Sequence, residues 1–569
     1  MTQADGTIPR NGAQSLLLGM KAAGIDWLFG NAGTDFPPII EALCQLDPDA
    51  VPRPVTCPHE SAAVGMAHGY WLATGRPQAV MVHVNVGLAN AAMGVINAAS
   101  DNVPMLVMSG RTPITEAGRP GCRVTPIHYG QEMYDQSDLV AEPVKFHYEM
   151  RFPEQGAALA DRALAIAASA PAGPAYLSLP REVLMAEIPE ALAAPVSARP
   201  PASPAHPDPV AIGRLAAWLQ AAETPLILVQ RGDPAGRLGR ALADFAARHA
   251  VAVAEPFPTR NVMADDHPCF LGQDVKGALK GADLVVVLDT PIPWVGATMA
   301  PAPGARVVHI APDPHFARLP VRGFRTDLAI AADPVAALAA LDGALPAPHG
   351  RAAARGAALA ERSAARRAAA RALAEAGCAA PMSAEWMSRC IGAVMDDGAV
   401  VFSELGVQPG VMGLKGANRF FSAPHSGGLG WALPAALGAQ LADRDRLVIA
   451  CVGDGSYIFA NPVACHQIAE ALALPVLTII KNNRMWNAVR RSVIGSYPDG
   501  AAARANAMPL TSLEPAPDFC AIAAASRAWT ARVDSGAALP GVLAEAVRVV
   551  REERRQALLD VSVALSDVH

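Results

Sequence analysis

Short apolar runs that alternate with helix-forming stretches are the feature of this sequence that most limits its fold. Seven segments each contain a short apolar run that does not alternate with polar residues, which is typical of strands buried inside parallel sheets. They occupy residues 77–84, 104–110, 225–232, 282–290, 306–314, 446–455 and 475–483. Because strands separated by helices build layered α/β domains, we predict α/β domains that each have a central, mostly parallel sheet flanked by helices.

Two changes in composition divide the 569 residues into three such domains. Residues 190–209 are rich in proline and small side chains, which helices and sheets exclude from their interiors, so they predict a linker. Residues 345–381 begin as an Ala/Arg stretch of high helix propensity with few large apolar groups, so they predict a surface-helical connector. The predicted domains are residues 1–189, residues 210–344 (Rossmann-like) and residues 382–569.

Charge and composition favour a small-molecule function. Hydrophobic residues make up 52% of the chain and the formal net charge is −6, so no basic surface is expected for nucleic acid or for acidic lipids. The nine cysteines are scattered without C-x-x-C pairs, which predicts reduced core thiols and no zinc site. Residues 1–14 are polar and no apolar stretch of about 20 residues occurs, so we expect a cytoplasmic protein with no membrane partner.

A carboxylate between two glycines follows the apolar run at residues 446–455. Open parallel sheets bind ligands beyond the carboxyl ends of their strands, which is where Asp454 lies. Flanking glycines let backbone N–H groups approach an anion, and a carboxylate is a ligand for Mg²⁺, so a magnesium diphosphate would suit both features. Asn482 and Asn483 come at the end of the next apolar run. Asn483 lies 29 residues after Asp454, which leaves room for one helix between the two strands. Taken alone, G-D-G is a weak signal, and a plain turn is the simpler interpretation of it.

Residues 453–483 resemble the thiamine-diphosphate motif, which runs from G-D-G to N-N in the diphosphate-binding domain of thiamine-diphosphate-dependent enzymes. The resemblance implies that Asp454, Asn483 and the backbone carbonyl of Met485 hold Mg²⁺. It also implies that the cofactor diphosphate lies against this motif, and the residues implied to bind it are Gly453, Asp454, Gly455, Ser456 and Asn483.

Two further segments resemble that family. Residues 55–77 match the segment that carries the activating glutamate of the amino-terminal, pyrimidine-binding domain, which implies that Glu60 contacts the cofactor pyrimidine. The alternative is a glutamate that merely favours a helix start. Residues 426–442 match the segment that carries the apolar wedge between the cofactor rings, and Leu429 fits that position. A Rossmann-type glycine loop is the competing interpretation, but the G-x-G-x-x-G spacing is missing.

The first domain carries residues that bear on the reaction. Residues 80–94 place His83 just after a strand, where benzoylformate decarboxylase-like enzymes hold a proton-transfer histidine, whereas a lone histidine is otherwise usually structural. Residues 29–43 resemble the glycine-rich substrate loop of the benzoylformate decarboxylase and acetolactate synthase relatives. Thr34 would bind substrate there beside Gly33, or would simply bond its own turn.

Candidate pocket walls lie in the other two domains. Trp294 follows a strand of the middle domain, at a place where decarboxylases present a histidine or an aromatic group. Trp486 and Asn487 follow the metal motif and would shape the pocket and donate a hydrogen bond. The sequence leaves His128 and His425 unassigned.

The resemblance covers nearly the whole chain and implies a thiamine-diphosphate-dependent lyase. The implied reaction is non-oxidative decarboxylation or carboligation of a 2-oxo acid through a C2 ylide and an enamine, with an aldehyde or a second 2-oxo acid as acceptor. An acetolactate synthase-like carboligase (transferase) is the alternative, and an acyl-CoA lyase or oxidase is less favoured. A catalytically silent, cofactor-binding subunit is the non-enzyme alternative.

The resemblance also implies cofactors and an assembly. The cofactors are thiamine diphosphate and Mg²⁺, and FAD is not expected. In that family the cofactor lies between the amino-terminal domain of one subunit and the carboxyl-terminal domain of another. A homodimer is therefore the expected minimum and a homotetramer the expected assembly.

Overall fold

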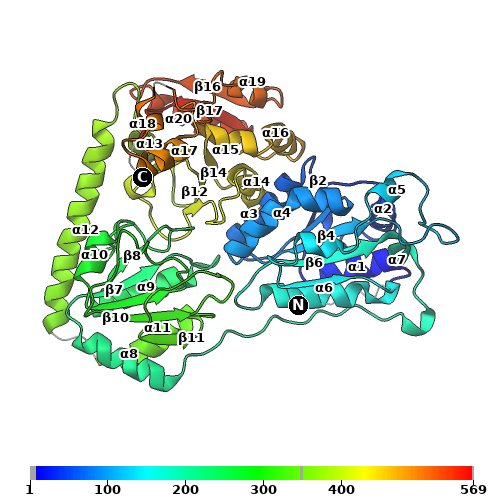
Figure 1. Cartoon of the computed structure of the whole chain (residues 1–569), viewed down its shortest axis with the longest axis horizontal. Helices are drawn as coiled ribbons and strands as arrows, with labels where there is room; N and C mark the ends of the chain where they lie inside the picture. The colour runs from blue at the N-terminus through cyan, green and yellow to red at the C-terminus, as the bar shows by residue number, and fades with distance from the viewer. Residues whose placement is uncertain (1–7, 347–349, 506, 567–569) are drawn as a thin grey trace. The chain divides into compact units, whose positions relative to one another are not determined.

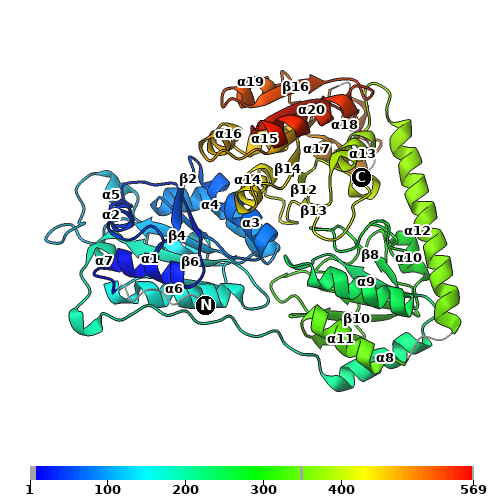
Figure 2. The same cartoon turned by 180° about the vertical axis from the view of Figure 1, so that it is seen from behind.

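The structure is a computed structural model that describes residues 8–346, 350–505 and 507–566. The remaining positions, at the two ends of the chain and inside the predicted connector and last domain, lie outside the described residues. The described chain forms three parallel sheets, which confirms the predicted fold class (Figures 1 and 2). Its contacts separate two compact units, of which the first comprises Met1–Ser203, Ala423–Arg444 and Ile458–Leu474, and the second comprises Pro204–Ser422, Asp445–Tyr457 and Pro475–His569.

The first unit contains a six-stranded sheet in the order β2-β1-β3-β4-β6-β5. One face is packed by apolar side chains of three helices, among them Leu16, Ile39 and Leu164. The strands are β1 (Trp27–Gly30), β2 (Arg53–Thr56), β3 (Ala79–Val82), β4 (Leu106–Arg111), β5 (Phe146–Glu149) and β6 (Ala175–Pro180). The helices of this segment are α1 (Gly12–Ala22), α2 (Pro37–Gln45), α3 (Glu60–Thr74), α4 (Val84–Ser100), α5 (Ile127–Gly130), α6 (Gly156–Ala168) and α7 (Arg181–Met185).

Two helices from late in the chain, α14 (Ala432–Ala442) and α16 (Pro462–Ala471), also belong to the first unit. Helix α14 packs along α3 at very close range because glycines face the opposite backbone. A Cβ atom on Gly69 would lie 1.8 Å from the carbonyl oxygen of Ala435, and one on Gly438 would lie 2.0 Å from that of Met66. Only glycine fits at these two positions, so this contact fixes the segment around Leu429 against the helix that begins at Glu60.

The second unit contains a five-stranded sheet in the order β11-β10-β9-β7-β8. Helix α8 begins where the Asp208 side chain accepts a hydrogen bond from the Val210 N–H and Pro209 occupies the first turn. The strands are β7 (Pro225–Val229), β8 (Ala252–Ala254), β9 (Leu284–Leu288), β10 (Arg306–Ala311) and β11 (Leu328–Ala331). The helices are α8 (Pro209–Ala221), α9 (Arg237–His249), α10 (Lys276–Gly281), α11 (Pro334–Ala344) and the long α12 (Gly350–Ala376), which occupies much of the predicted connector.

The second unit also contains a six-stranded sheet in the order β13-β12-β14-β15-β17-β16. Apolar side chains of α13 and α20, such as Ile391 and Leu543, pack against strand residues such as Ile479. The strands are β12 (Val400–Glu404), β13 (Phe420–Ser422), β14 (Val448–Gly453), β15 (Leu477–Asn482), β16 (Trp529–Val533) and β17 (Ala557–Ser562). The remaining helices are α13 (Ala384–Val394), α15 (Asp454–Phe459), α17 (Asn487–Ser496), α18 (Ala501–Arg504), α19 (Phe519–Ala524) and α20 (Leu539–Glu552).

The structure corrects two details of the sequence interpretation. The chain between β14 and β15 forms two helices, α15 and α16, where one was predicted. Asn461 has a left-handed backbone (φ 52°) and Pro462 follows it, so the first helix cannot continue into the second. The nine cysteines are free, but they are not all core thiols, because Cys44 is exposed and three others are only half-buried. In the described part of the chain no helix has both the length and the apolar character needed to cross a membrane.

Candidate functional site

Glu60 lies at the first position of α3, and its carboxylate is held by two amide side chains. Asn31, directly after β1, donates from Nδ2 to Oε1 at 2.8 Å, and Asn90 of α4 donates to Oε2 at 3.1 Å. The side chain is buried, with 6% of the residue exposed. A Cβ on Gly87 would lie 3.1 Å from Oε1, so α4 approaches the carboxylate closely at a glycine. The helix start and the two amide donors together orient this carboxyl group precisely.

His83 is the N-cap residue of α4, directly after β3, and its ring is anchored to a buried carboxylate. Its Nδ1 lies 2.5 Å from Oδ1 of Asp35, and the other oxygen of Asp35 accepts a hydrogen bond from the Val84 N–H at 3.2 Å. The hydrogen bond from Asp35 raises the pKa of His83, and the charge of Glu60 acts in the same direction. His83 therefore keeps its proton to a higher pH than a free histidine does.

The second ring nitrogen of His83 faces Gln131. The two nitrogens, Nε2 of each side chain, lie 3.2 Å apart, and Oε1 of Gln131 is buried without a partner among the described residues. The amide can donate to neutral His83 and, after turning over, accept from the protonated ring. His128 lies nearby, and its burial lowers its pKa, so it stays neutral while His83 is charged.

The loop after β1 wraps around this imidazole. A Cβ on Gly33 would lie 2.1 Å from Nδ1 of His83, and a Cβ on Gly110 would lie 1.7 Å from Oδ2 of Asp35, so both glycines are needed for the pair to form. Val84 has φ 31°, an unfavourable backbone for a β-branched residue that marks local strain at this point. Thr34 is exposed beside the pair, and its carbonyl accepts a hydrogen bond from Arg181.

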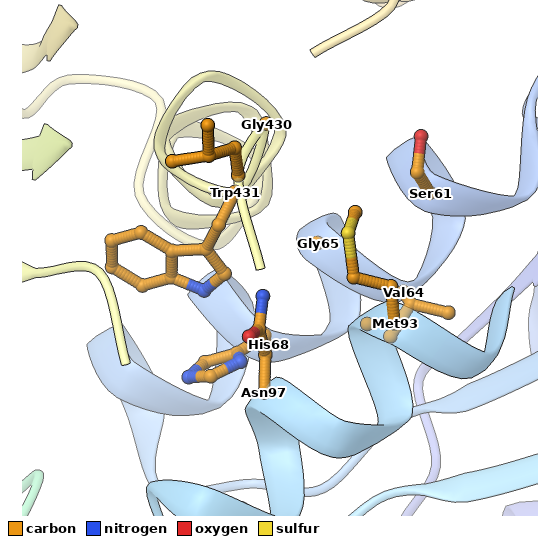
Figure 3. A pocket seen from close by; sticks show the side chains of 10 residues that line it. Ser61, Val64, Gly65, His68, Met93, Asn97, Gly430 and Trp431 are labelled. Carbon is orange, nitrogen blue, oxygen red and sulfur yellow. The ribbon is translucent and has the colours of Figure 1, made fainter. Parts of the chain in front are cut away.

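Leu429 lies in a loop that Asn97 of α4 holds in place. The Asn97 amide donates to the carbonyl of Gly428 at 2.9 Å, and its oxygen accepts from the Ser426 hydroxyl at 2.7 Å. Leu429 lines a small pocket in which His68 and Trp431 meet edge to face, their ring centroids 5.3 Å apart (Figure 3). The pocket volume of about 10 Å³ leaves room for about one water molecule.

In the second unit, Asp454 is the middle residue of the G-D-G sequence and the first residue of α15. Its Oδ1 accepts a hydrogen bond from the Gly455 N–H at 2.9 Å, and its Oδ2 accepts from the Asn483 N–H at 3.2 Å. Burial raises the pKa of this carboxyl, although backbone N–H groups oppose the shift. The Asn483 side chain accepts from the Met485 N–H at 3.1 Å, so the three residues predicted to bind the metal lie together.

Asn482 has a different partner, which the sequence did not reveal. Its amide donates to Oδ1 of Asp560 at 2.8 Å, and this bond ties the end of β15 to β17. Beyond it, residues 484–486 run antiparallel to residues 511–513, with a hydrogen bond of 2.7 Å from the Trp486 N–H to the carbonyl of Thr511. The two asparagines thus have different roles. Asn482 ties β15 to β17, whereas Asn483 faces Asp454.

The residues around Asp454 fit a diphosphate and its metal. They line a pocket of about 80 Å³, into which the buried Ser456 hydroxyl brings an oxygen with no partner among the described residues. A Cβ on Gly455 would lie 2.2 Å from the Trp486 ring, whereas one on Gly453 would meet nothing closer than 3.8 Å. Within the described residues no three His, Cys, Asp or Glu side chains are placed to hold a metal, so a cation here would complete its shell with amide, carbonyl, water and phosphate oxygens.

Two predicted pocket walls lie apart from each other. Asn487 is the first residue of α17, lines the same pocket as Trp486, and donates to the carbonyl of Ser566 at 2.9 Å. Trp294 packs in the hydrophobic core of the middle sheet, edge to face against Phe324, with 4% of its surface exposed. The structure gives Trp294 a core role, so we do not carry it forward as a pocket residue.

Three family models match the chain. The N-terminal TPP binding domain of thiamine pyrophosphate enzymes matches residues 10–139, the central domain matches residues 212–341, and the C-terminal TPP binding domain matches residues 408–561. Together these segments contain Asp35, Glu60, His83, Asp454 and Asn483.

Similar proteins extend over nearly the whole chain. Benzoylformate decarboxylase of Pseudomonas aeruginosa is 27% identical over 89% of this chain and 90% of its own. An acetolactate synthase large subunit of Parasynechococcus marenigrum is 26% identical over 90% of this chain and 82% of its own. The crystal structure of benzoylformate decarboxylase from Polynucleobacter necessarius superposes with a TM-score of 0.78 at 20% identity, covering 98% of this chain and 99% of that one. The three-sheet architecture is therefore shared along the full length of the chain.

Proposed function

Because this chain belongs to the thiamine pyrophosphate enzyme family, we propose that it is a non-oxidative decarboxylase that releases carbon dioxide from a 2-oxo acid. The observation that carries the proposal is the contact between buried Asp35 and half-buried His83, whose atoms Oδ1 and Nδ1 lie 2.5 Å apart in the domain that also presents Glu60. Decarboxylation replaces a carboxylate by a proton, so it requires a protonated group at the reacting carbon.

Thiamine diphosphate and Mg²⁺ are the cofactors that the two sites would hold. Asp454, Asn483 and the carbonyl of Met485 would bind the metal, and Ser456 would meet the diphosphate. Glu60 would hold the pyrimidine end, and Leu429 would be the apolar residue that the family resemblance implies against the cofactor rings. When bound, this cofactor supplies an electron sink for the pair that remains when carbon dioxide leaves.

Glu60 holds or releases a proton at a carboxyl oxygen. Its two oxygens already accept hydrogen bonds from Asn31 and Asn90, which fix the plane of the carboxyl group. A buried and oriented acid of this kind moves a proton without reorganising solvent. We assign it the proton exchange with the pyrimidine ring that the family resemblance implies.

His83 stores the second proton. Asp35 accepts from Nδ1, which leaves Nε2 as the position that gains and loses a proton. The raised pKa keeps this proton on the ring to a higher pH than in a free histidine, and a turn of the Gln131 amide adapts to either charge state. We assign Nε2 of His83 the delivery of a proton to the carbon from which carbon dioxide departs.

The substrate walls remain part of the proposal. Gly33 and Thr34 border His83 in the first unit, whereas Trp486 and Asn487 line the Asp454 pocket in the second. We propose a small 2-oxo acid as substrate, with a homodimer as the minimum assembly and a homotetramer as the full one. Carboligation with an aldehyde or a second 2-oxo acid is the second candidate, which the similarity to an acetolactate synthase large subunit supports.

The test is a panel of aromatic, branched and short aliphatic 2-oxo acids, assayed for carbon dioxide with thiamine diphosphate and Mg²⁺, with and without an aldehyde acceptor. We expect carbon dioxide from at least one class and a loss of about 10²-fold or more in His83→Ala. The matched control is His147→Ala, which removes an exposed histidine from β5 of the same sheet. Cofactor binding without carbon dioxide from any member would contradict decarboxylation, and equal product from His83→Ala with an acceptor would favour the carboligase.

A further inference from the structure

Lys481 is a basic residue beside the Asp454 pocket for which neither the motif nor the proposed reaction has a use. It lies near the end of β15 and is half-buried, yet its side chain makes no hydrogen bond or ion pair in the described part of the chain. A lysine that gives up water without gaining a partner costs stability. Such a residue calls for an anion that binds there.

The position of Lys481 in β15 places it at the Asp454 pocket. Lys481 is the last residue but one of β15, and Asn483 follows directly after the strand. The neighbour of Lys481 in register on β14 is Gly453, where a Cβ would meet Leu405 and the Ser456 hydroxyl at 3.8 Å without a clash. Lys481 accordingly lines the same pocket as Asp454 and Ser456.

A second cation lines this pocket. Arg491 lies one helical turn after Asn487 in α17, and positions four apart share one helix face. The pocket therefore presents two cations, Lys481 and Arg491, against one carboxylate, Asp454. The buried hydroxyl of Ser456, which has no partner among the described residues, adds a donor.

The charges decide which ligand fits. A diphosphate carries more negative charge than one Mg²⁺ neutralises, and Asp454 adds a further negative charge. Two cations at the same pocket would balance that excess, and a metal ion alone would be repelled by them. This set suits a metal diphosphate better than it suits either component alone.

We propose that Lys481 is a second cationic clamp on the cofactor diphosphate, which acts beside the metal instead of through it. This inference rests on the proposed function, because it takes thiamine diphosphate as the ligand. It predicts that this chain retains weak cofactor binding when the metal is removed, since a protein cation still meets the phosphate oxygens.

The experiment is calorimetric titration of the full-length protein with thiamine diphosphate, in saturating Mg²⁺ and in EDTA. Lys481→Met keeps the side-chain length without the charge and should weaken binding about 10- to 100-fold in Mg²⁺, the factor that one charge-assisted hydrogen bond represents. In EDTA its binding should vanish, whereas Lys481→Arg should keep most of the affinity. The apo Tm of Lys481→Met should be unchanged or higher, because an unpartnered cation is removed.

Arg484→Met is the matched control, because Arg484 also follows β15 but is exposed, pairs with Glu514 and lines another pocket. It should change the affinity by no more than about twofold. The inference is overturned if Lys481→Met binds as the wild type does, if Arg484→Met loses as much, or if Lys481→Met lowers the apo Tm together with the affinity. Failure of the wild type itself to bind in Mg²⁺ would overturn the proposed function together with this inference.

Discussion

The first and third sheets share one strand order, yet they present different chemistry at corresponding points. In each, the strands run second, first, third, fourth, sixth, fifth in chain order. The segment after the second strand carries Glu60 in the first sheet and Leu429 in the third. The segment after the third strand carries His83 in the first sheet and Asp454 in the third. The topology thus provides the same two positions twice, and the residue types decide what each position does.

The surroundings of these positions differ in the same way. In the first sheet, the ionisable groups are held by uncharged amides and by one another, which suits the storage and transfer of protons. In the third sheet, a single carboxylate shares its pocket with two cations and a hydroxyl, which suits the binding of a charged ligand. Under the proposed function, the first sheet supplies the groups that transfer protons and the third sheet retains the cofactor.

The variant Glu60→Gln tests whether proton transfer belongs to the first sheet, and we expect the largest effect from it. The amide cannot exchange a proton, so kcat should fall by about 10²- to 10⁴-fold while cofactor affinity changes little. The measurement is exchange of the cofactor C2 proton by NMR, with calorimetry for binding. Undiminished exchange would show that the first sheet is not where protons move.

A second variant, Asp454→Ala, should impair cofactor binding at the third sheet and leave the groups of the first sheet unchanged. We expect Mg²⁺-dependent cofactor affinity to fall by about 10- to 100-fold, since a carboxylate ligand is lost, as measured by calorimetry across a range of Mg²⁺ concentrations. The apo Tm should not fall, because a carboxyl whose pKa burial raises is removed. Asp560→Ala serves as the control, since it breaks the bond to Asn482 and should lower the Tm. Unchanged Mg²⁺ dependence in Asp454→Ala would contradict the metal site.

The smallest of the three effects is expected from Asp35→Asn, which sharpens the role of the first sheet. The neutral side chain keeps a hydrogen-bond acceptor for Nδ1 of His83 but removes the charge, so the pKa of His83 should fall. The alkaline limb of the kcat profile should then move to lower pH, with a loss of about tenfold at neutral pH. If the alkaline limb of the kcat profile keeps its position in Asp35→Asn, the ionisation of His83 does not determine that limb.

The free energy of unfolding provides an independent test of Asp35→Asn. The folded-state pKa of His83 is raised, so the Asp35 contact stabilises the protein fully below the unfolded pKa and this stabilisation is lost as pH rises through the folded pKa. Asp35→Asn should therefore lower the free energy of unfolding at acidic pH more than at alkaline pH. Urea unfolding at both pH values measures the difference, and an equal loss at both would assign Asp35 a purely steric role.

Residues inside recognisable segments were predicted at their places in the chain, whereas their partners were not. The apolar runs predicted seven strands, and a strand lies at each of them, although β4 extends one residue beyond its run. Asp35 escaped prediction because an aspartate in a glycine-proline loop is typical of a turn, and its partner lies 48 residues away. Asn31 and Asn90 escaped for the same reason, since each meets Glu60 only after three separate segments pack together. Lys481 was not predicted as a site residue, because a single charged side chain near the end of a strand is usually solvated.

The sequence by itself determined the three parallel sheets and the points where chemistry begins, because apolar periodicity and glycine-flanked carboxylates are local properties of a chain. Only the tertiary structure decided which groups face each carboxylate and imidazole. It paired Asp35 with His83, divided Asn482 from Asn483, buried Trp294 in a core and left Lys481 beside Asp454 without a partner. Such pairings depend on ångström-scale approaches at glycines such as Gly33, Gly110 and Gly455, which no pattern of neighbouring residues specifies.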